Sequence, residues 1–313
     1  MFEGGSSQPA VSEADSADAP PRLGADFVRR WLDCAGAALG LRAEFPFARV
    51  RRFGGQARRV CVPYLSYAHL DAAGTAALLA GEKTGGSLVR HLAALPPDAP
   101  EGTPVISAVP LFLWRDADDF WEHALTANLR KKIRKATKSG HLVERSNLPA
   151  AARDFHSLFA ATMHRHGTPP YPRKLFEEAL ARCGGEVVTV RRGDTIVVAY
   201  FLLHDREIAL FMWAGFNPAE DAGYASLLGE WDSIRDAFAR GCRWFDLGRA
   251  PLGSPAWRHK QYWHPRLFHA TTTPPPGGSV YSRYAFASRL WRRLPAGLAR
   301  RLGPWVVSHL PDA

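Results

Sequence analysis

The sequence predicts an α/β protein, because helical and strand patterns alternate along most of the chain. A meander of β-branched and aromatic runs over Glu186–Gly215 precedes an amphipathic helix at Tyr224–Arg240 and a short strand at Trp244–Gly248. With 313 residues, 46% of them hydrophobic and 22% charged, the chain can build a large core in one or two domains. This composition excludes wholesale disorder, and the longest apolar runs fall far short of the roughly 20 residues of a membrane span.

Upstream of the meander, the pattern predicts elements of both kinds. Helical spacing of apolar residues covers Ala25–Leu41 and, less regularly, Gly74–Leu95, so we expect a helix at each. Val50–Tyr67 is predicted as strand material interrupted by a Gly54-Gly55 turn. The apolar run Val105–Trp114 predicts a short buried strand.

A helix with two distinct faces is predicted to begin at Phe120 and to end at Gly140. Its apolar stripe and its basic face lie on different sides, and the basic face consists of Arg130, Lys131, Arg134, Lys135 and Lys138. Such a face is either an anion-binding site or a solvated helix surface. Two further helices are expected near Ala150–His166 and Arg173–Cys183.

The charge of the chain is strongly one-sided. Lys and Arg number 40 against 30 Asp and Glu, a net charge of +10, and ten positive charges lie between Leu247 and Pro311 without one acidic residue. This distribution favours an anionic partner, namely a phosphate-bearing cofactor, a nucleic acid or an anionic lipid surface. The four cysteines form no CxxC motif, so we expect reduced core thiols, with neither a zinc site nor a disulfide framework.

The two ends of the chain differ in character. Residues 1–22 are small, polar and acidic, so we expect a disordered tail without a secretion signal and a cytoplasmic protein. Thr271–Gly278 is predicted as a Pro/Gly linker. Tyr281–Leu310 combines tryptophans and leucines with six arginines. It either contacts an anionic membrane at the inner face or docks on the domain with its arginines in water.

Three stretches resemble the FemAB-like branch of the GNAT acyltransferases. They are the basic helix LRKKIRKATKSG from Leu129, the turn GTPPYP from Gly167, and FDLGR from Phe245, which follows the helix that ends at Gly241. Lys260 lies where that branch often has a lysine before an aromatic residue. The closing segment through Pro304 is similar to proteins associated with exopolysaccharide or envelope loci. The resemblance covers roughly residues 117–304.

The resemblance implies a GNAT-like fold with two GNAT-like halves, each a mixed sheet flanked by helices. It places the first, shortened half at 23–145, the second half with the acyltransferase core at 146–272, and the C-terminal segment at 273–313. It implies acyl transfer to an amine of an envelope, polysaccharide or small-metabolite acceptor. The donor is expected to be acyl-coenzyme A, with aminoacyl-tRNA, used by FemAB peptidyltransferases, as the alternative. No metal is implied.

Acyl transfer needs groups that bind phosphates, stabilise an oxyanion and move protons. For the chemistry we select Tyr171, Asp246 and Lys260; for donor binding we select Arg130, Arg134, Lys135, Tyr224 and Arg249. In the GNAT plan the donor phosphates lie over a strand–helix loop, here Phe216–Gly223, which lacks the glycine-rich signature of acetyl-coenzyme A enzymes. Tyr171 has core packing as its alternative role, and Asp246 a structural ion pair.

Two other classes of protein fit the same charge pattern. The basic surface would also suit a non-catalytic protein that binds tRNA or an anionic membrane, for which a steep salt dependence is expected. A degenerate acyltransferase fold that serves only as a partner in a complex is the other alternative.

Overall fold

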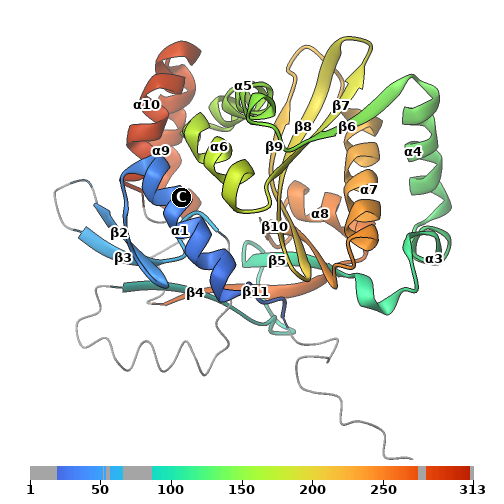
Figure 1. Ribbon diagram of the computed structural model, residues 1–313, viewed down its shortest axis with the longest axis horizontal. Helices are drawn as coiled ribbons and strands as arrows, with labels where there is room; N and C mark the ends of the chain where they lie inside the picture. Colours follow the sequence, from blue (N-terminus) through green and yellow to red (C-terminus); the bar gives the residue numbers. More distant parts are fainter. Residues whose placement is uncertain (1–19, 52, 54–56, 66–86, 274–279, 311–313) are drawn as a thin grey trace, which may run out of the picture.

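A mixed sheet of eleven strands forms the centre of the computed structural model, which describes residues 20–51, 53, 57–65, 87–273 and 280–310, without the side chains of 280–285. The strand order is β1-β2-β3-β4-β11-β5-β10-β9-β8-β7-β6 (Figure 1). The strands are β1 (Arg42–Glu44), β2 (Phe47–Arg51), β3 (Ala57–Cys61), β4 (Ser87–Ala94), β5 (Pro104–Pro110), β6 (His141–Ser146), β7 (Glu186–Arg192), β8 (Thr195–Asp205), β9 (Ile208–Phe216), β10 (Trp244–Pro251) and β11 (Arg266–Thr273).

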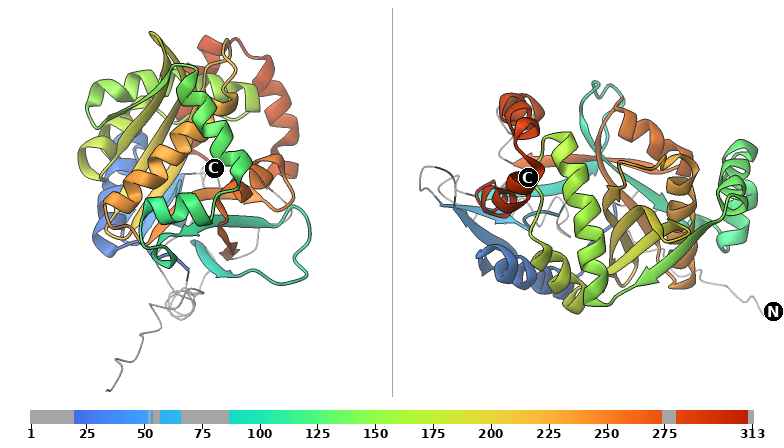
Figure 2. Two further views of the ribbon diagram at one scale, coloured as in Figure 1. Left: turned by 90° about the vertical axis from the view of Figure 1, so that its right-hand side faces the viewer. Right: turned by 90° about the horizontal axis from the view of Figure 1, so that it is seen from above.

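Helices cover both faces of this sheet (Figures 1 and 2). The α-helices are α1 (Ala25–Leu39), α3 (Ala117–His123), α4 (Ala127–Lys138), α5 (Pro149–His166), α6 (Arg173–Arg182), α7 (Gly223–Ala239), α8 (Pro255–Lys260), α9 (Val280–Arg293) and α10 (Ala296–Ser308). Short 3-10 turns occupy Leu111–Leu113 and Gln261–Trp263. Helices α1, α5, α6 and α10 pack on one face, and α3, α4 and α7 pack on the other.

The alternation of side chains along β8 divides the core between these two faces. Phe201 and Leu203 pack among α1, α5 and α6, whereas Tyr200 and Leu202 pack beneath α7. All four side chains are buried, as expected for a central strand with helices on both sides. The meander, the helix that follows it and the first helix at α1 confirm the predictions from the sequence.

The helix predicted to begin at Phe120 is two helices. Thr126 interrupts the pattern, because its extended backbone and its side chain, which accepts a hydrogen bond from the Leu129 N–H, start α4 afresh. Phe120 belongs to α3, while Leu129, Ile133 and Ala136 form the buried stripe of α4. The basic residues of α4 therefore keep the predicted spacing along one helix.

Two other predictions were wrong. Within the predicted helix Gly74–Leu95, residues 87–94 form β4, because this apolar run pairs with β11 in the sheet interior; residues 74–86 lie outside the described residues. Within the predicted linker, Thr271–Thr273 complete β11, and 274–278 lie outside the described residues. The sequence also gave no indication of β6, the strand at the far edge of the sheet.

Strand β11 pairs with β4 and β5, so the sheet runs across the expected boundary between the halves. The boundaries at 22, 145 and 272 therefore remain predictions. Of the expected tail, residues 1–19 lie outside the described residues.

The pairing between strands β9 and β10 ends in the middle of the sheet, and the two strands separate. They pair in parallel from Trp244 opposite Ile208 as far as Asp246 opposite Leu210. Beyond that point β10 bulges and continues beside β5, while β9 continues beside β8 to Phe216. The two strands consequently diverge, and α7 and α8 border the space between them.

The C-terminal segment docks on the domain. The inner face of α10 buries Ala299, Gly303 and Val307, and the Tyr64 hydroxyl donates a hydrogen bond to the Val307 carbonyl at 3.1 Å. Among the described helices, none has the length and hydropathy needed to cross a membrane. The four cysteines are buried free thiols, as predicted.

Candidate active site

A pocket of about 410 Å³ opens where β9 and β10 diverge. Its wall is mainly aromatic and aliphatic, as in most small-molecule sites. Four polar side chains, Ser226 and Glu230 from α7 and His259 and Lys260 from α8, lie among the apolar ones. The apolar lining consists of Tyr200, Phe211, Met212, Trp213, Ala214, Phe216, Leu247 and Ala256.

Glu230 is the buried acid of the pocket, with 6% of its surface exposed. The indole N–H of Trp263 donates to its Oε2 at 2.6 Å, and His259 Nε2 lies 2.8 Å from Oε1 and 3.0 Å from Oε2. The hydrogen bond to Glu230 raises the pKa of His259, against the opposite effect of burial. With Nε2 directed at the carboxylate, Nδ1 is the nitrogen left to exchange a proton.

Lys260 is held at the bulge of β10. Its ammonium donates to the carbonyls of Gly248 at 2.7 Å and Arg249 at 3.1 Å. Burial lowers the pKa of Lys260 to about 8, although the negative charges of Asp246 and Glu230 act in the opposite direction. A lysine with such a pKa can exchange a proton near neutral pH.

Asp246 does not line the pocket, but it stabilises the turn that holds Lys260. Its side chain is 3% exposed, and its Oδ1 accepts a hydrogen bond of 2.6 Å from the Gly248 N–H. Gly248 has a φ of 80°, which favours glycine, and the resulting turn presents its carbonyl to Lys260. The predicted Asp246 and Lys260 therefore come together through one glycine, while Arg249 contributes its backbone carbonyl and an exposed side chain.

Tyr171 lies in the core and does not line the pocket. Its ring stacks on Phe159, with centroids 6.0 Å apart, and lies 5.4 Å from Trp213, a pocket residue. Burial raises the pKa of Tyr171 to about 12, so its hydroxyl is neutral at physiological pH. Its catalytic role stays a prediction. Among the described residues, the link between Tyr171 and the pocket is its contact with Trp213.

The predicted donor-binding residues of α4 have different surroundings. Arg130 is 19% exposed and donates to the backbone carbonyls of Trp121 and Glu122, so it joins α4 to α3. The exposed Arg134 has its guanidinium 5.5 Å from the Trp121 ring centroid. Lys135 has its ammonium 5.0 Å from the ring centroid of Tyr224, in the first turn of α7.

Lys132, which was not predicted from the sequence, is linked to a pocket residue through Tyr262. Its ammonium is 5.2 Å from the ring centroid of Tyr262, and that ring meets the His259 ring edge-on at 5.7 Å. Its charge lowers the pKa of His259, a smaller effect than that of Glu230. Lys132 is thus linked to the pocket through Tyr262 and His259, whereas Lys135 contacts Tyr224, a residue of α7 that does not line the pocket.

The loop before α7 is acidic. Asp221 accepts a hydrogen bond of 2.9 Å from the Gly223 N–H, so its carboxylate caps the helix N-terminus. Glu220 forms an ion pair with Arg192 at 2.6 Å, and the Asn217 side chain donates to the Ile196 carbonyl at 3.0 Å. The negative charge of Asp221 disfavours a phosphate at this helix end.

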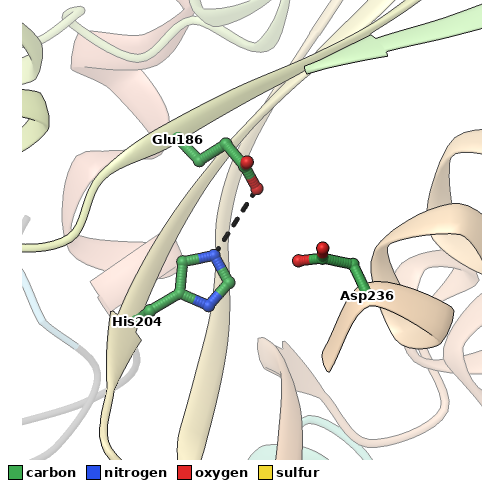
Figure 3. A group of neighbouring side chains, drawn as sticks. All are labelled: Glu186, His204 and Asp236. Carbon is green, nitrogen blue, oxygen red and sulfur yellow. Dashed lines mark ion pairs between the residues drawn. The ribbon is translucent and has the colours of Figure 1, made fainter. Parts of the chain in front are cut away.

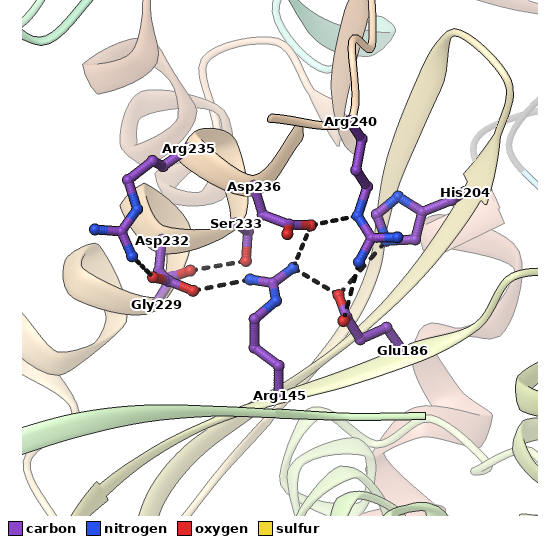
Figure 4. Close-up of polar contacts among 9 residues, drawn as sticks. All are labelled: Arg145, Glu186, His204, Gly229, Asp232, Ser233, Arg235, Asp236 and Arg240. Atoms are coloured by element: carbon purple, nitrogen blue, oxygen red, sulfur yellow. Dashed lines mark hydrogen bonds and ion pairs between the residues drawn. The ribbon is translucent and has the colours of Figure 1, made fainter. Parts of the chain in front are cut away.

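A second polar cluster lies on another side of α7. Arg145 Nη2 is 2.5 Å from Glu186 Oε2 and 2.7 Å from Asp236 Oδ2, and its Nη1 is 2.8 Å from Asp232 Oδ2 (Figure 4). Arg240 also pairs with Glu186 and Asp236. Burial acts to raise the pKa of Glu186, but its hydrogen bonds and charge interactions, led by that of His204, lower it to about 2.

Three members of this cluster have spacing that would suit a metal ion. The ligand atoms of Glu186, His204 and Asp236 lie within 4.8 Å of one another (Figure 3). Among the described residues, no other group of three or more histidine, cysteine, aspartate or glutamate side chains is spaced to hold a metal ion. The guanidinium groups of Arg145 and Arg240 already bond both carboxylates. Because arginine supplies the positive charge here, the residues do not fit a metal site.

Glu230, His259 and Lys132 were not predicted from the sequence. The sequence pattern around Glu230 could have indicated a functional role. Its carboxylate lies among apolar residues of a helix that is buried on several sides, and a buried carboxylate needs a partner. His259 directly precedes Lys260, but only the tertiary structure shows that it meets Glu230 from 29 residues away.

A family model matches the part of the chain that contains this site. Residues 124–261 match the family described as "Acetyltransferase (GNAT) domain". No curated protein sequence matches the chain.

Among solved structures, FemX is similar with a TM-score of 0.56 and 13% identity, covering 77% of this chain and 89% of that one. The C-terminal domain of a putative lysylphosphatidylglycerol synthetase from Agrobacterium fabrum has a TM-score of 0.53 and 12% identity, covering 89% and 96%. A conserved protein of unknown function from Bacteroides thetaiotaomicron has a TM-score of 0.50 and 11% identity, covering 80% and 91%. At these identities the likeness concerns the fold.

Proposed function

We propose that this protein transfers an acyl group from acyl-coenzyme A to an amine, because residues 124–261 match the GNAT acetyltransferase domain. The acceptor class is an amine of an envelope, polysaccharide or small metabolite. The observation that carries the proposal is the pocket between β9 and β10, where an apolar wall meets Lys260 and the Glu230–His259 pair.

The apolar wall suits the neutral part of an acyl carrier, and the lysines suit its phosphates. Lys132 and Lys135 lie beside the aromatic rings of Tyr262 in the turn after α8 and of Tyr224 in the first turn of α7, the two helices that supply the polar residues of the pocket. We place the donor phosphates on these two ammonium groups, because Asp221 occupies the N-terminus of α7. Arg134 and Arg249 remain proposed as outer contacts, and Arg130 as their structural support.

In the proposed reaction the amine nitrogen attacks the acyl carbonyl carbon, and the bond from that carbon to the carrier atom breaks. His259, oriented by Glu230, takes the proton of the amine at Nδ1. The Lys260 ammonium stabilises the oxyanion and gives its proton to the leaving group. Asp246 acts as a positioning residue by fixing the Gly248 turn that holds Lys260.

Aminoacyl-tRNA is the second candidate donor, and one observation favours it. The carboxylate of Asp221 already bonds the Gly223 N–H at the N-terminus of α7, and its negative charge disfavours a diphosphate there. The fold similarity to a putative lysylphosphatidylglycerol synthetase domain supports an aminoacyl group and a lipid-linked acceptor in this case. A location at the inner face of the membrane would follow from such an acceptor.

A ligand titration tests the proposal. Acetyl-coenzyme A and longer acyl-coenzyme A species should raise the melting temperature of the full chain, while a mixture of charged tRNAs should not. The variant K132A/K135A should weaken donor binding about tenfold or more, whereas K131A/K138A, which removes two exposed lysines of the same helix, should change it little. Stabilisation by charged tRNA alone, with aminoacyl transfer, would select the second donor.

A further inference from the structure

The outer face of α10 carries an apolar stripe that the fold does not bury. Leu298, Leu302 and Trp305 recur at intervals of four and three residues and are 44%, 39% and 58% exposed. The opposite face of the same helix packs on the domain through Ala299, Gly303 and Val307. Since that inner face already anchors the helix, the outer stripe is not needed for docking.

The tertiary structure extends this stripe with a residue from the other end of the chain. Phe53, in the turn after β2, is 52% exposed, and its ring lies edge-on to Trp305 with centroids 5.4 Å apart. The same ring stacks on His309 at 5.1 Å. Phe53, Leu298, Leu302 and Trp305 together form what we call the aromatic patch, in which Phe53 contacts Trp305 of α10.

The charge around the aromatic patch is positive. Arg300 and Arg301 are exposed on α10, and Arg292 and Arg293 are exposed at the end of α9. The sequence has no acidic residue from 248 to 311. Helix α9 adds exposed Phe286 and Leu290 one turn apart.

We propose that the aromatic patch docks on an anionic lipid surface, with its rings and leucines among the headgroups and the arginines on lipid phosphates. Tryptophan and leucine on one helix face, flanked by arginines, are the features of helices that lie in a membrane interface. The absence of acidic residues from this segment complements anionic lipid, since each arginine near such a surface adds to binding. This inference does not depend on the proposed acyl transfer.

Vesicle co-sedimentation of the full chain tests the proposal. The protein should bind phosphatidylcholine vesicles containing about one third phosphatidylglycerol, and bind vesicles of phosphatidylcholine alone at least about tenfold more weakly. F53S/W305S should reduce binding to the anionic vesicles about tenfold or more. At low salt, R300Q/R301Q should reduce binding to the anionic vesicles by a similar factor. At high salt, where the charges are screened, the same variant should reduce binding by a smaller factor.

The matched control is L142S, which removes a leucine that is 65% exposed, more than any residue of the aromatic patch, from the edge strand β6 and should leave vesicle binding unchanged. Melting temperatures identify the variants that remain folded, and because this control needs no acyl-coenzyme A binding, the test can fail independently of the proposed function. The proposal is overturned if folded protein ignores anionic vesicles, if F53S/W305S binds them as the parent does, or if the patch instead mediates self-association seen by ultracentrifugation.

Discussion

His259 meets the buried carboxylate of Glu230 across the pocket, with Nε2 2.8 Å from Oε1, although α7 and α8 are separated in sequence by β10. The same carboxylate accepts the indole hydrogen of Trp263. Glu230 is thus bonded to two donors, and because it engages Nε2 of the histidine, Nδ1 remains available for proton transfer. This relationship is the basis of the first prediction.

The variant E230Q should lower kcat/KM about a hundredfold, because a neutral amide no longer stabilises the His259 cation. The hydrogen bond to Glu230 raises the pKa of His259, so the acid limb of the wild-type profile should lie above the usual histidine value. In E230Q that limb should move to lower pH. The pH profile of kcat/KM measures both effects, and an unmoved acid limb would rule out His259 as the base.

Lys260 should produce the alkaline limb of the same profile. The proposed role requires the charged ammonium, and its pKa is about 8, so activity should fall as the pH rises through that value. K260R keeps a positive charge that does not titrate there and should abolish the limb while retaining part of the activity. K260M should lose about a hundredfold or more at all pH values. An alkaline limb that persists in K260R would contradict the assignment.

Gly215 should tolerate no side chain. A Cβ built at this position of β9 would lie 2.5 Å from the Phe159 nitrogen and 2.8 Å from the Leu158 carbonyl carbon, both backbone atoms of α5. G215A should therefore lower the free energy of unfolding by about 2 kcal/mol or more. G297A provides the control, because nothing lies within 4 Å of its Cβ in α10, and it should be neutral or stabilising by about 0.5 kcal/mol. Urea denaturation distinguishes the two, and equal effects would show that the α5–β9 contact is looser than described.

The cluster around Arg145 should dominate acid stability. Because the pKa of Glu186 is lowered from 4.5 to about 2, its contribution to folding is present above pH 4.5 and is lost as the pH falls toward 2. The contribution is on the order of 3 kcal/mol. Urea denaturation at several pH values should show this loss in the wild type and a smaller one in E186Q.

R145M should destabilise the protein at pH 7 by about 3–5 kcal/mol, because it leaves the carboxylates of Glu186, Asp232 and Asp236 close together without their shared partner. R49M removes a half-exposed arginine that pairs with Glu44, and it should cost about 0.5 kcal/mol or less. Comparable losses in the two variants would mean that the Arg145 cluster is no more than a surface ion pair.

The sequence was informative where one pattern decides one element. The stripe of Leu129 and Ile133 and the basic face of α4 follow from helical periodicity, which depends on nearby residues alone. The error at β4 arose because a short apolar run suits a buried strand as well as a buried helix, and pairing with β11, about 180 residues away, decides between them. Lys260 and Asp246 were found as motif residues, but nothing local indicated that Gly248 connects them.

The sequence by itself determined the α/β class, the meander, the basic helix and the one-sided charge, since periodicity and composition act over a few residues or over the whole chain. The tertiary structure decided which of these groups meet. In the fold, Tyr171 lies in the core, Glu230 bonds His259, and the ring of Phe53 contacts Trp305. Sheet pairing and helix docking bring together segments that are far apart in the chain. The residue at which β10 stops pairing with β9 depends on these long-range contacts, so local sequence spacing does not predict it.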